Sequence, residues 1–168
     1  MSQTILQPQP KKITQLQPLI ITSPAFQRGD LISSRYTLEG KNVPPPLRIM
    51  QIPAGAATLA VVMTESGEAS DGRTRWIARN ITPATYLTEN LRQCTTGKND
   101  HGVRYTGPTA TFAKHKFTIT VFALDIWLRL GNEADYRQLE KAMAGHIIAS
   151  GQTNFKYRRY DRHFRHLL

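Results

Sequence analysis

The sequence predicts a mainly β domain of the sandwich type, and three observations support this prediction. Its 168 residues are enough for one domain with a sizeable core. Ten prolines and eleven glycines separate short β-branched runs, which is typical of a sandwich rather than a helix bundle. The clearest run, residues 117–124, alternates like a strand whose two faces are both largely covered.

The first 18 residues are rich in glutamine and proline and carry Lys11 and Lys12, so we expect a loose N-terminal arm. This arm contains no apolar core like that of a signal peptide. No stretch of the chain approaches the roughly 20 apolar residues of a membrane span. These features favour a cytoplasmic protein. Cys94 is the only cysteine, so no internal disulfide can form.

A glycine- and asparagine-rich loop over residues 97–108 precedes the predicted strand. His115 shares parity with Phe117 and Ile119, so its ring is expected on the same face of the strand as theirs. An ionisable ring at the mouth of an apolar strand, beside a turn of small residues, is one way to build a shallow anion pocket.

The one long helix is predicted over residues 134–149. Asn132 is a suitable N-cap, and Glu133 and Asp135 in the first turn complement the helix dipole. The apolar residues that recur at helical spacing and mark one face are Tyr136, Leu139, Met143 and Ile147.

The loop and the strand that follows it carry a recognisable order of residues: Gly97, Asn99, Gly102, Tyr105, Gly107-Pro108, His115 and Ala123-Leu124-Asp125. This order resembles a segment of the phosphatidylethanolamine-binding protein family, which includes the Raf kinase inhibitor proteins and small bacterial members. The family segment reads G-x-N-x-x-G-x-x-Y-x-G-P, then H-R-Y and a strand that ends in A-L-D.

Further motifs of this family occur in the same order, and the resemblance places the domain at residues 19–159. The matching segments are 21–26, 29–30 and 35–37 (opening strands), 40–47 (G-x-N-x-x-P-P-L loop), 59–63 (first core strand), Trp76 with Asn80-Ile81 (H-W strand) and 142–149 (A-M-x-G-H-I helix). The resemblance implies an antiparallel β-sandwich with a few short peripheral helices. It also implies a non-enzymatic role in binding and regulation, and a homodimer.

The family's ligand pocket is built around an Asp-Pro-Asp-Ala-Pro turn, the histidine of H-W and the H-R-Y segment. Here the turn reads Glu65-Ser66-Gly67-Glu68-Ala69, and without its prolines it is expected to be flexible. Arg75 replaces the H-W histidine, and Phe117 replaces the tyrosine. The ligand-binding residues that the resemblance implies are therefore Glu65, Arg75, Gly107, Pro108, His115 and Phe117.

Two interpretations of Arg75 stay open. Its guanidinium carries a permanent charge and forked donors, so with His115 it can hold a phosphate or a carboxylate. The ligand would then be an anionic small molecule or a phospholipid headgroup. Alternatively, Arg75 pairs with Glu65 and fills the pocket, since an arginine beside a carboxylate is often structural.

The formal net charge of +10 rests partly on a basic C-terminal segment that ends in the tail of residues 160–168. Aromatic residues alternate with its cations, a pattern that suits RNA, an anionic membrane surface or an acidic protein. It is equally typical of a solvated tail. The basic-surface residues are Lys156, Arg158, Arg159, Arg162 and Arg165.

No nucleophile elbow, phosphate loop, dinucleotide fingerprint or zinc spacing occurs in the sequence. We therefore expect no enzymatic activity, no cofactor and no metal site. The first hypothesis is a non-enzymatic domain that binds an anionic group at Arg75 and His115. The alternative is an adaptor or structural protein with a defunct pocket, whose basic surface binds an acidic macromolecule.

Overall fold

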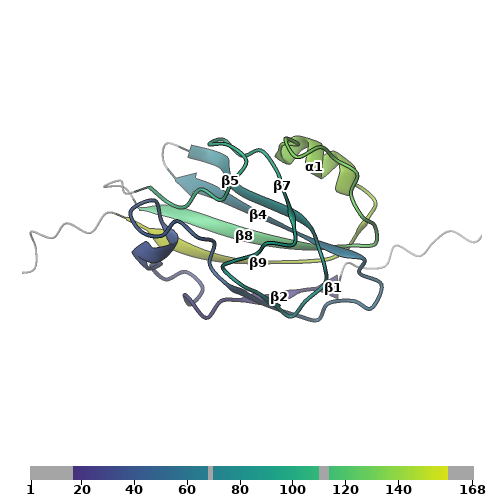
Figure 1. Cartoon of the computed structure of the whole chain (residues 1–168). Coiled ribbons are helices and arrows are strands. Elements are labelled where there is room, and N and C mark those ends of the chain that lie inside the picture. The colour runs from purple at the N-terminus through teal and green to yellow at the C-terminus, as the bar shows by residue number, and fades with distance from the viewer. Residues whose placement is uncertain (1–16, 68–69, 110–113, 159–168) are drawn as a thin grey trace, which may run out of the picture.

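The computed structural model describes residues 17–67, 70–109 and 114–158, and its architecture is mainly β, as the sequence predicts. A six-stranded sheet has the order β1-β9-β8-β4-β5-β7, and a three-stranded sheet has the order β2-β3-β6 (Figure 1). The strands are β1 (Gln17–Pro18), β2 (Ile20–Thr22), β3 (Leu47–Met50), β4 (Thr58–Gly67), β5 (Ser70–Ile81), β6 (Tyr86–Leu87), β7 (Thr95–Thr96), β8 (His115–Leu124) and β9 (Ile147–Tyr157).

Strand β4 lies inside the large sheet, where it pairs antiparallel with both β5 and β8. Strand β8 pairs antiparallel with β9 in turn. The one parallel pair among the described strands is β1 with β9, in which Gln17 faces Ala149. Strand β1 thus begins within the segment predicted as an N-terminal arm. Residues 1–16 of that arm and the predicted tail 160–168 lie outside the described residues.

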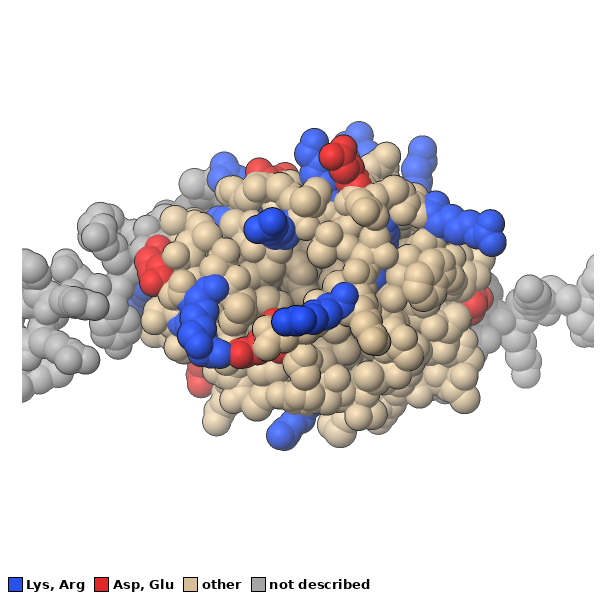
Figure 2. Space-filling model, viewed as in Figure 1, with Lys and Arg blue, Asp and Glu red and all other residues tan. Residues whose placement is uncertain are grey.

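Charged side chains are distributed widely over the surface. Figure 2 shows lysine and arginine side chains spread over one face, where they exceed the acidic ones. The chain has 22 lysines and arginines against 12 acidic residues, so the excess is a property of the whole chain and not of the predicted tail alone. No helix in the described part of the chain is long and apolar enough to cross a membrane.

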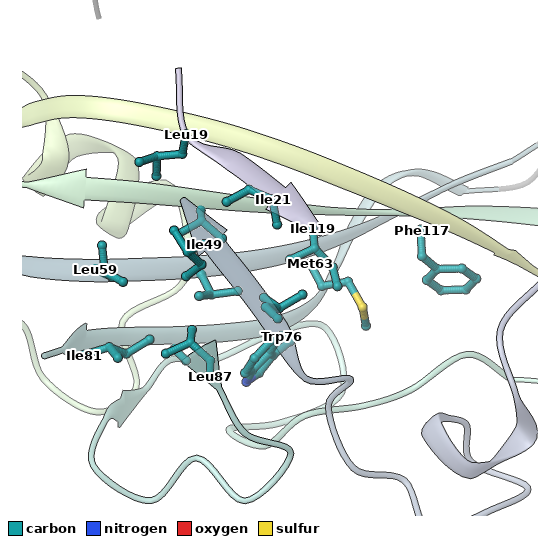
Figure 3. Close-up of a cluster of buried hydrophobic side chains, with 14 of the residues drawn as sticks. Leu19, Ile21, Ile49, Leu59, Met63, Trp76, Ile81, Leu87, Phe117 and Ile119 are labelled. Atoms are coloured by element: carbon teal, nitrogen blue, oxygen red, sulfur yellow. The ribbon is translucent and has the colours of Figure 1, made fainter. Parts of the chain in front are cut away.

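The main core lies between the two sheets. Figure 3 shows Leu59 and Met63 of β4 and Ile119 of β8 close to Ile49 of β3 and Leu87 of β6. These side chains alternate with half-buried or outward-facing ones on β3 and β8, as the strand period requires. Strand β4 is instead buried on both faces over its first six residues.

The second core cluster covers part of the outer face of the large sheet. Helix α1 (Tyr136–Met143) places Leu139 and Met143 against residues such as Val62 and Ile77. Figure 1 shows this helix over one part of the sheet only. The rest of that outer face is formed by polar strand residues, including Thr118 and Asn154.

The helix is shorter than the predicted span of residues 134–149. Asp135, and not Asn132, is its N-cap: the Asp135 carboxylate accepts from Gln138 N, and Gln138 Oε1 accepts from Asp135 N. The helix ends at Met143 because Ala144 leaves helical geometry and Gly145 has a φ of 78°. Ile147, predicted on the helix face, is the first residue of β9.

Two other predictions of local structure are wrong. Residues 29–30 and 35–37, which resemble opening strands, do not form strands. Residues 29–30 lie in a turn, and residues 35–37 lie in or directly after a 3₁₀-helix over Ser34–Tyr36, where the Ser33 hydroxyl accepts from Arg35 N. Residues 65–67, predicted as part of a flexible turn, continue strand β4. Without prolines, every residue there has an N–H for the ladder, and β4 and β5 stay paired to Gly67 and Ser70.

Candidate functional site

Three charged or ionisable side chains from three neighbouring strands meet at one end of the large sheet. Glu65 lies on β4, Arg75 on β5, and His115 is the first residue of β8. The β4–β5 register shifts between Met63–Trp76 and Thr64–Thr74. Arg75 is therefore an extra residue in a β-bulge, and bulges commonly redirect a side chain. This redirection brings its guanidinium to the carboxylate of Glu65.

The carboxylate of Glu65 lies between the guanidinium of Arg75 and the imidazole of His115. Arg75 Nε donates to Glu65 Oε2 over 2.7 Å, and Arg75 Nη2 lies 2.6 Å from the same oxygen. His115 Nδ1 lies 2.8 Å from the other oxygen, Oε1. This third contact lacks hydrogen-bond geometry. The two carboxylate oxygens are thus divided between the guanidinium and the imidazole.

The cluster is buried, and not all of its polar atoms have hydrogen-bond partners. The Arg75 and Glu65 side chains are 5% and 6% exposed, and that of His115 is 12% exposed. Four buried side-chain nitrogen atoms of the described residues have no hydrogen-bond partner, and two of them belong to this cluster: Arg75 Nη1 and His115 Nδ1. Buried polar groups in native proteins are nearly always hydrogen-bonded, so Arg75 Nη1 is an exception, whereas His115 Nδ1 lies against Glu65 Oε1.

Glycines and a loop complete the surroundings of the cluster. Gly67 packs against His115, where a Cβ would lie 3.0 Å from Nδ1. Gly107 N donates to Asn42 Oδ1 over 2.8 Å, and Pro108 O accepts from Leu38 N over 3.0 Å. A Cβ on Gly107 would overlap the carbonyl oxygen of Tyr36, so glycine is required there.

The Gly107 segment is tied to Arg75 through the backbone. Arg75 O accepts from Thr106 N and from Asn99 Nδ2, each over 3.0 Å. Asn99 also accepts from His101 N through its Oδ1. The predicted residues Gly107 and Pro108 are therefore fixed beside the strand that carries Arg75, although their own contacts are with residues 36–42.

His101 is a neighbour of the cluster that the sequence analysis missed. Partial burial of its ring, together with the positive charge of Arg75, lowers the pKa of His101, and the charge of Glu65 acts on it in the opposite direction. The sequence did contain a signal for this residue, because His101 lies in the same motif-bearing loop as Asn99. It could not be interpreted without knowing that this loop folds back onto β5.

Phe117 lies below the cluster as part of the core. It is the cross-strand partner of Glu65, is 1% exposed, and stacks on Phe155 at a centroid distance of 5.3 Å. Of the predicted basic surface, Lys156 lies on β9 and Arg158 directly follows it. Arg159, Arg162 and Arg165 lie outside the described residues. Within residues 17–67, 70–109 and 114–158, no three His, Cys, Asp or Glu side chains are grouped to hold a metal ion.

Comparisons with known proteins agree with this architecture. The sequence profile described as "Phosphatidylethanolamine-binding protein" matches residues 22–158. A UPF0098 protein of Pyrococcus horikoshii is 32% identical over 149 residues, which are 82% of this chain and 75% of the relative.

Two solved structures are also similar. A phosphatidylethanolamine-binding protein homologue from Chlamydia trachomatis has a TM-score of 0.79 at 28% identity, over 86% of this chain and 99% of that one. YbcL of Escherichia coli, described as a member of the mammalian family, has a TM-score of 0.73 over 84% and 99% of the two chains, and at 20% identity this likeness concerns the fold alone. The match of the family profile to most of the sequence, on a fold shared with these structures, means that the chain belongs to the phosphatidylethanolamine-binding protein family.

Proposed function

We propose that this protein binds an anionic group, a phosphate or a carboxylate, beside Arg75 and His115. We further propose that it acts by binding, in a regulatory role, rather than by catalysis. Small anionic molecules and phospholipid headgroups both carry a suitable group.

The observation that supports this proposal most strongly is the unpartnered Nη1 atom of Arg75. The guanidinium has five N–H donors, and Glu65 engages only the Nε and Nη2 edge. Nη1 is buried without a partner among the described residues. Leaving a buried donor of a charged group unsatisfied costs about 1–3 kcal/mol or more. A ligand oxygen at Nη1 would remove that cost.

Glu65 is compatible with anion binding because it orients the guanidinium. A carboxylate on one edge fixes the plane of Arg75, which leaves Nη1 as the donor without a partner among the described residues. The Nδ1 side of the His115 ring faces the Glu65 carboxylate, so its second ring nitrogen, Nε2, points away from it. The same contacts support binding rather than catalysis, since the carboxylate that could serve as a general base is already engaged by Arg75.

A titration of the ¹⁵N-labelled full chain with inorganic phosphate, phosphoethanolamine and acetate tests this proposal. We expect phosphate to shift the amide resonances of Glu65, Arg75 and His115, and the side-chain Nε–H resonance of Arg75. Tighter binding of phosphoethanolamine than of phosphate would indicate a site for a phospholipid headgroup. Acetate tests whether the site accepts a carboxylate. Arg75→Lys keeps the charge but removes the forked donors, so affinity should fall about tenfold or more.

The matched control is Arg48→Gln, which changes an exposed arginine on the outer face of β3. Its affinity for phosphate should equal that of the unmodified protein. The absence of any shift at the three cluster positions, up to millimolar ligand, would contradict the proposal. The Arg75–Glu65 pair would then be a closed structural contact.

A further inference from the structure

Four cations gather on the outer face of the large sheet, where β8 begins and β9 ends. We call Lys114, Lys116, Lys156 and Arg158 the β8–β9 basic patch. Lys116 and Lys156 are direct cross-strand partners. Lys114 and Arg158 flank the next pair, His115 and Tyr157, so they lie at the adjoining ends of the same two strands. The sequence analysis had identified only Lys156 and Arg158, because the β8 lysines join them solely through strand pairing.

The patch is electrostatically unfavourable in the isolated protein. Like charges directly opposite each other on neighbouring strands destabilise a sheet. Paired strands lie about 4.8 Å apart, well within the Debye length of about 8 Å at physiological salt, so these charges repel one another. None of the four forms an ion pair with any residue of the described part of the chain. Contact with a surface of negative charge would relieve this repulsion.

The surroundings of the patch favour a flat partner. Its neighbours on the same face are the polar residues Ser66, Thr118 and Asn154 and the exposed Leu31, which is bridged to Lys156. One acidic residue, Asp71, is the cross-strand partner of Ser66 in the same row. The aromatic residues of these strand ends, Phe117 and Phe155, alternate with the cations and are buried on the opposite face. The patch therefore has positive charge on a strand surface but no described exposed ring on which a nucleic-acid base could stack.

We infer that the β8–β9 basic patch docks the protein onto a membrane surface of anionic phospholipid. The inference does not depend on the pocket, because the patch lies on the outer face of the sheet and uses different residues. Each lysine or arginine held near an anionic leaflet strengthens binding about fivefold. Three such residues together contribute about a hundredfold.

The test is co-sedimentation of the full chain with vesicles of phosphatidylglycerol and phosphatidylcholine, compared with vesicles of phosphatidylcholine alone. The patch variant carries Lys114→Gln, Lys116→Gln and Lys156→Gln. The control variant carries Arg129→Gln, Arg137→Gln and Lys141→Gln, three exposed cations near α1. Both variants lose three positive charges. The two variants differ in where the charges are removed. The patch lies at the His115 end of β8, whereas α1 packs near the Leu124 end, and these two ends lie about 30 Å apart.

We expect the unmodified protein to bind the anionic vesicles and not the neutral ones, and rising salt to weaken that binding. The patch variant should bind about a hundredfold more weakly, and the control variant within about threefold of the unmodified protein. Equal losses in both variants would overturn the inference, because they would show a general effect of net charge. So would the absence of binding to anionic vesicles, or patch-dependent binding of duplex RNA without vesicle binding.

Discussion

The Glu65 carboxylate contacts two neighbouring side chains, Arg75 and His115. Arg75 directs two nitrogen atoms to one carboxylate oxygen, and His115 Nδ1 lies against the other. Desolvating a guanidinium is costly unless a counter-charge and hydrogen bonds remain with it. The carboxylate therefore stabilises the fold and also orients Arg75 for the proposed anion.

Glu65→Gln is expected to destabilise the protein by about 3 kcal/mol, because removing one partner of a buried ion pair leaves the other charge uncompensated. Urea denaturation followed by circular dichroism measures this change. The control is Glu133→Gln, an exposed carboxylate ahead of α1, which should alter stability by less than about 0.5 kcal/mol. Equal stability of the two variants would contradict the assignment of Glu65 as a buried counter-charge.

Residue identity predicted which side chains meet but not how they meet. The motif spacing named Glu65, Arg75 and His115 together, and the structure brings all three into contact. The motif spacing alone could not decide whether the pocket is open or whether Arg75 pairs with Glu65. That choice depends on the β-bulge at Arg75 and on the continuation of β4 through Gly67, and both are properties of strand register. His101 was missed for a similar reason, since its position depends on a loop fold.

The C-terminal end of β5 holds the connection between β8 and α1. Asn80 has a φ of 55°, and its side chain forms two hydrogen bonds of 2.9 Å with the backbone N and O of Leu128. Its neighbour Arg79 donates through Nη2 to the carbonyls of Leu130 and Gly131. Burial lowers the pKa of Arg79, and Nε and Nη1 of this arginine have no hydrogen-bond partner among the described residues.

Asn80→Ala should destabilise the protein by at least about 3 kcal/mol. It leaves two buried backbone groups of Leu128 unsatisfied, at about 1–3 kcal/mol each, and places alanine in the left-handed region, at about 1 kcal/mol. Urea denaturation measures the loss against Asn132→Ala, an exposed asparagine before α1. If both variants unfold at the same urea concentration, Asn80 does not hold this connection.

The sequence predicted long strands better than short elements. The run of residues 117–124 is β8 with two residues added at its start, and residues 59–63 lie within β4. The predicted helix was too long because Ile147 suits both a helical face and a strand of β-branched residues. Only the pairing of β9 with β8 distinguishes these two possibilities. The 3₁₀-helix at Ser34–Tyr36 depends on the Ser33 cap and has no apolar period to reveal it.

Several tyrosines make the free energy of unfolding depend on pH in the alkaline range. Burial raises the pKa of Tyr105 strongly, and it is also the leading cause that raises the pKa of Tyr136 and of Tyr157. The folded state keeps these protons, whereas the unfolded chain releases them near pH 10. Because the native state then binds more protons, the free energy of unfolding must fall as the pH rises above about 10.

Urea denaturation at several pH values between about 8 and 11 measures this fall. In Tyr105→Phe the decline should be shallower, since the most strongly affected phenol is removed. At about pH 8 the same variant should lose about 1 kcal/mol, because the phenol donates to Tyr36 O over 2.7 Å, and this difference should narrow as the pH rises above about 10. A decline as steep as that of the unmodified protein would show that Tyr105 is not the group responsible.

Anion binding beside Arg75 is tested most directly by a crystal structure of the full chain grown with selenate, whose selenium can be located by anomalous scattering. We expect the anion with an oxygen within hydrogen-bond distance of Arg75 Nη1, while Nε and Nη2 keep their contacts with Glu65. A structure in which Nη1 is bonded to a protein group or to water, with no anion beside Arg75 and His115, would contradict the proposed function.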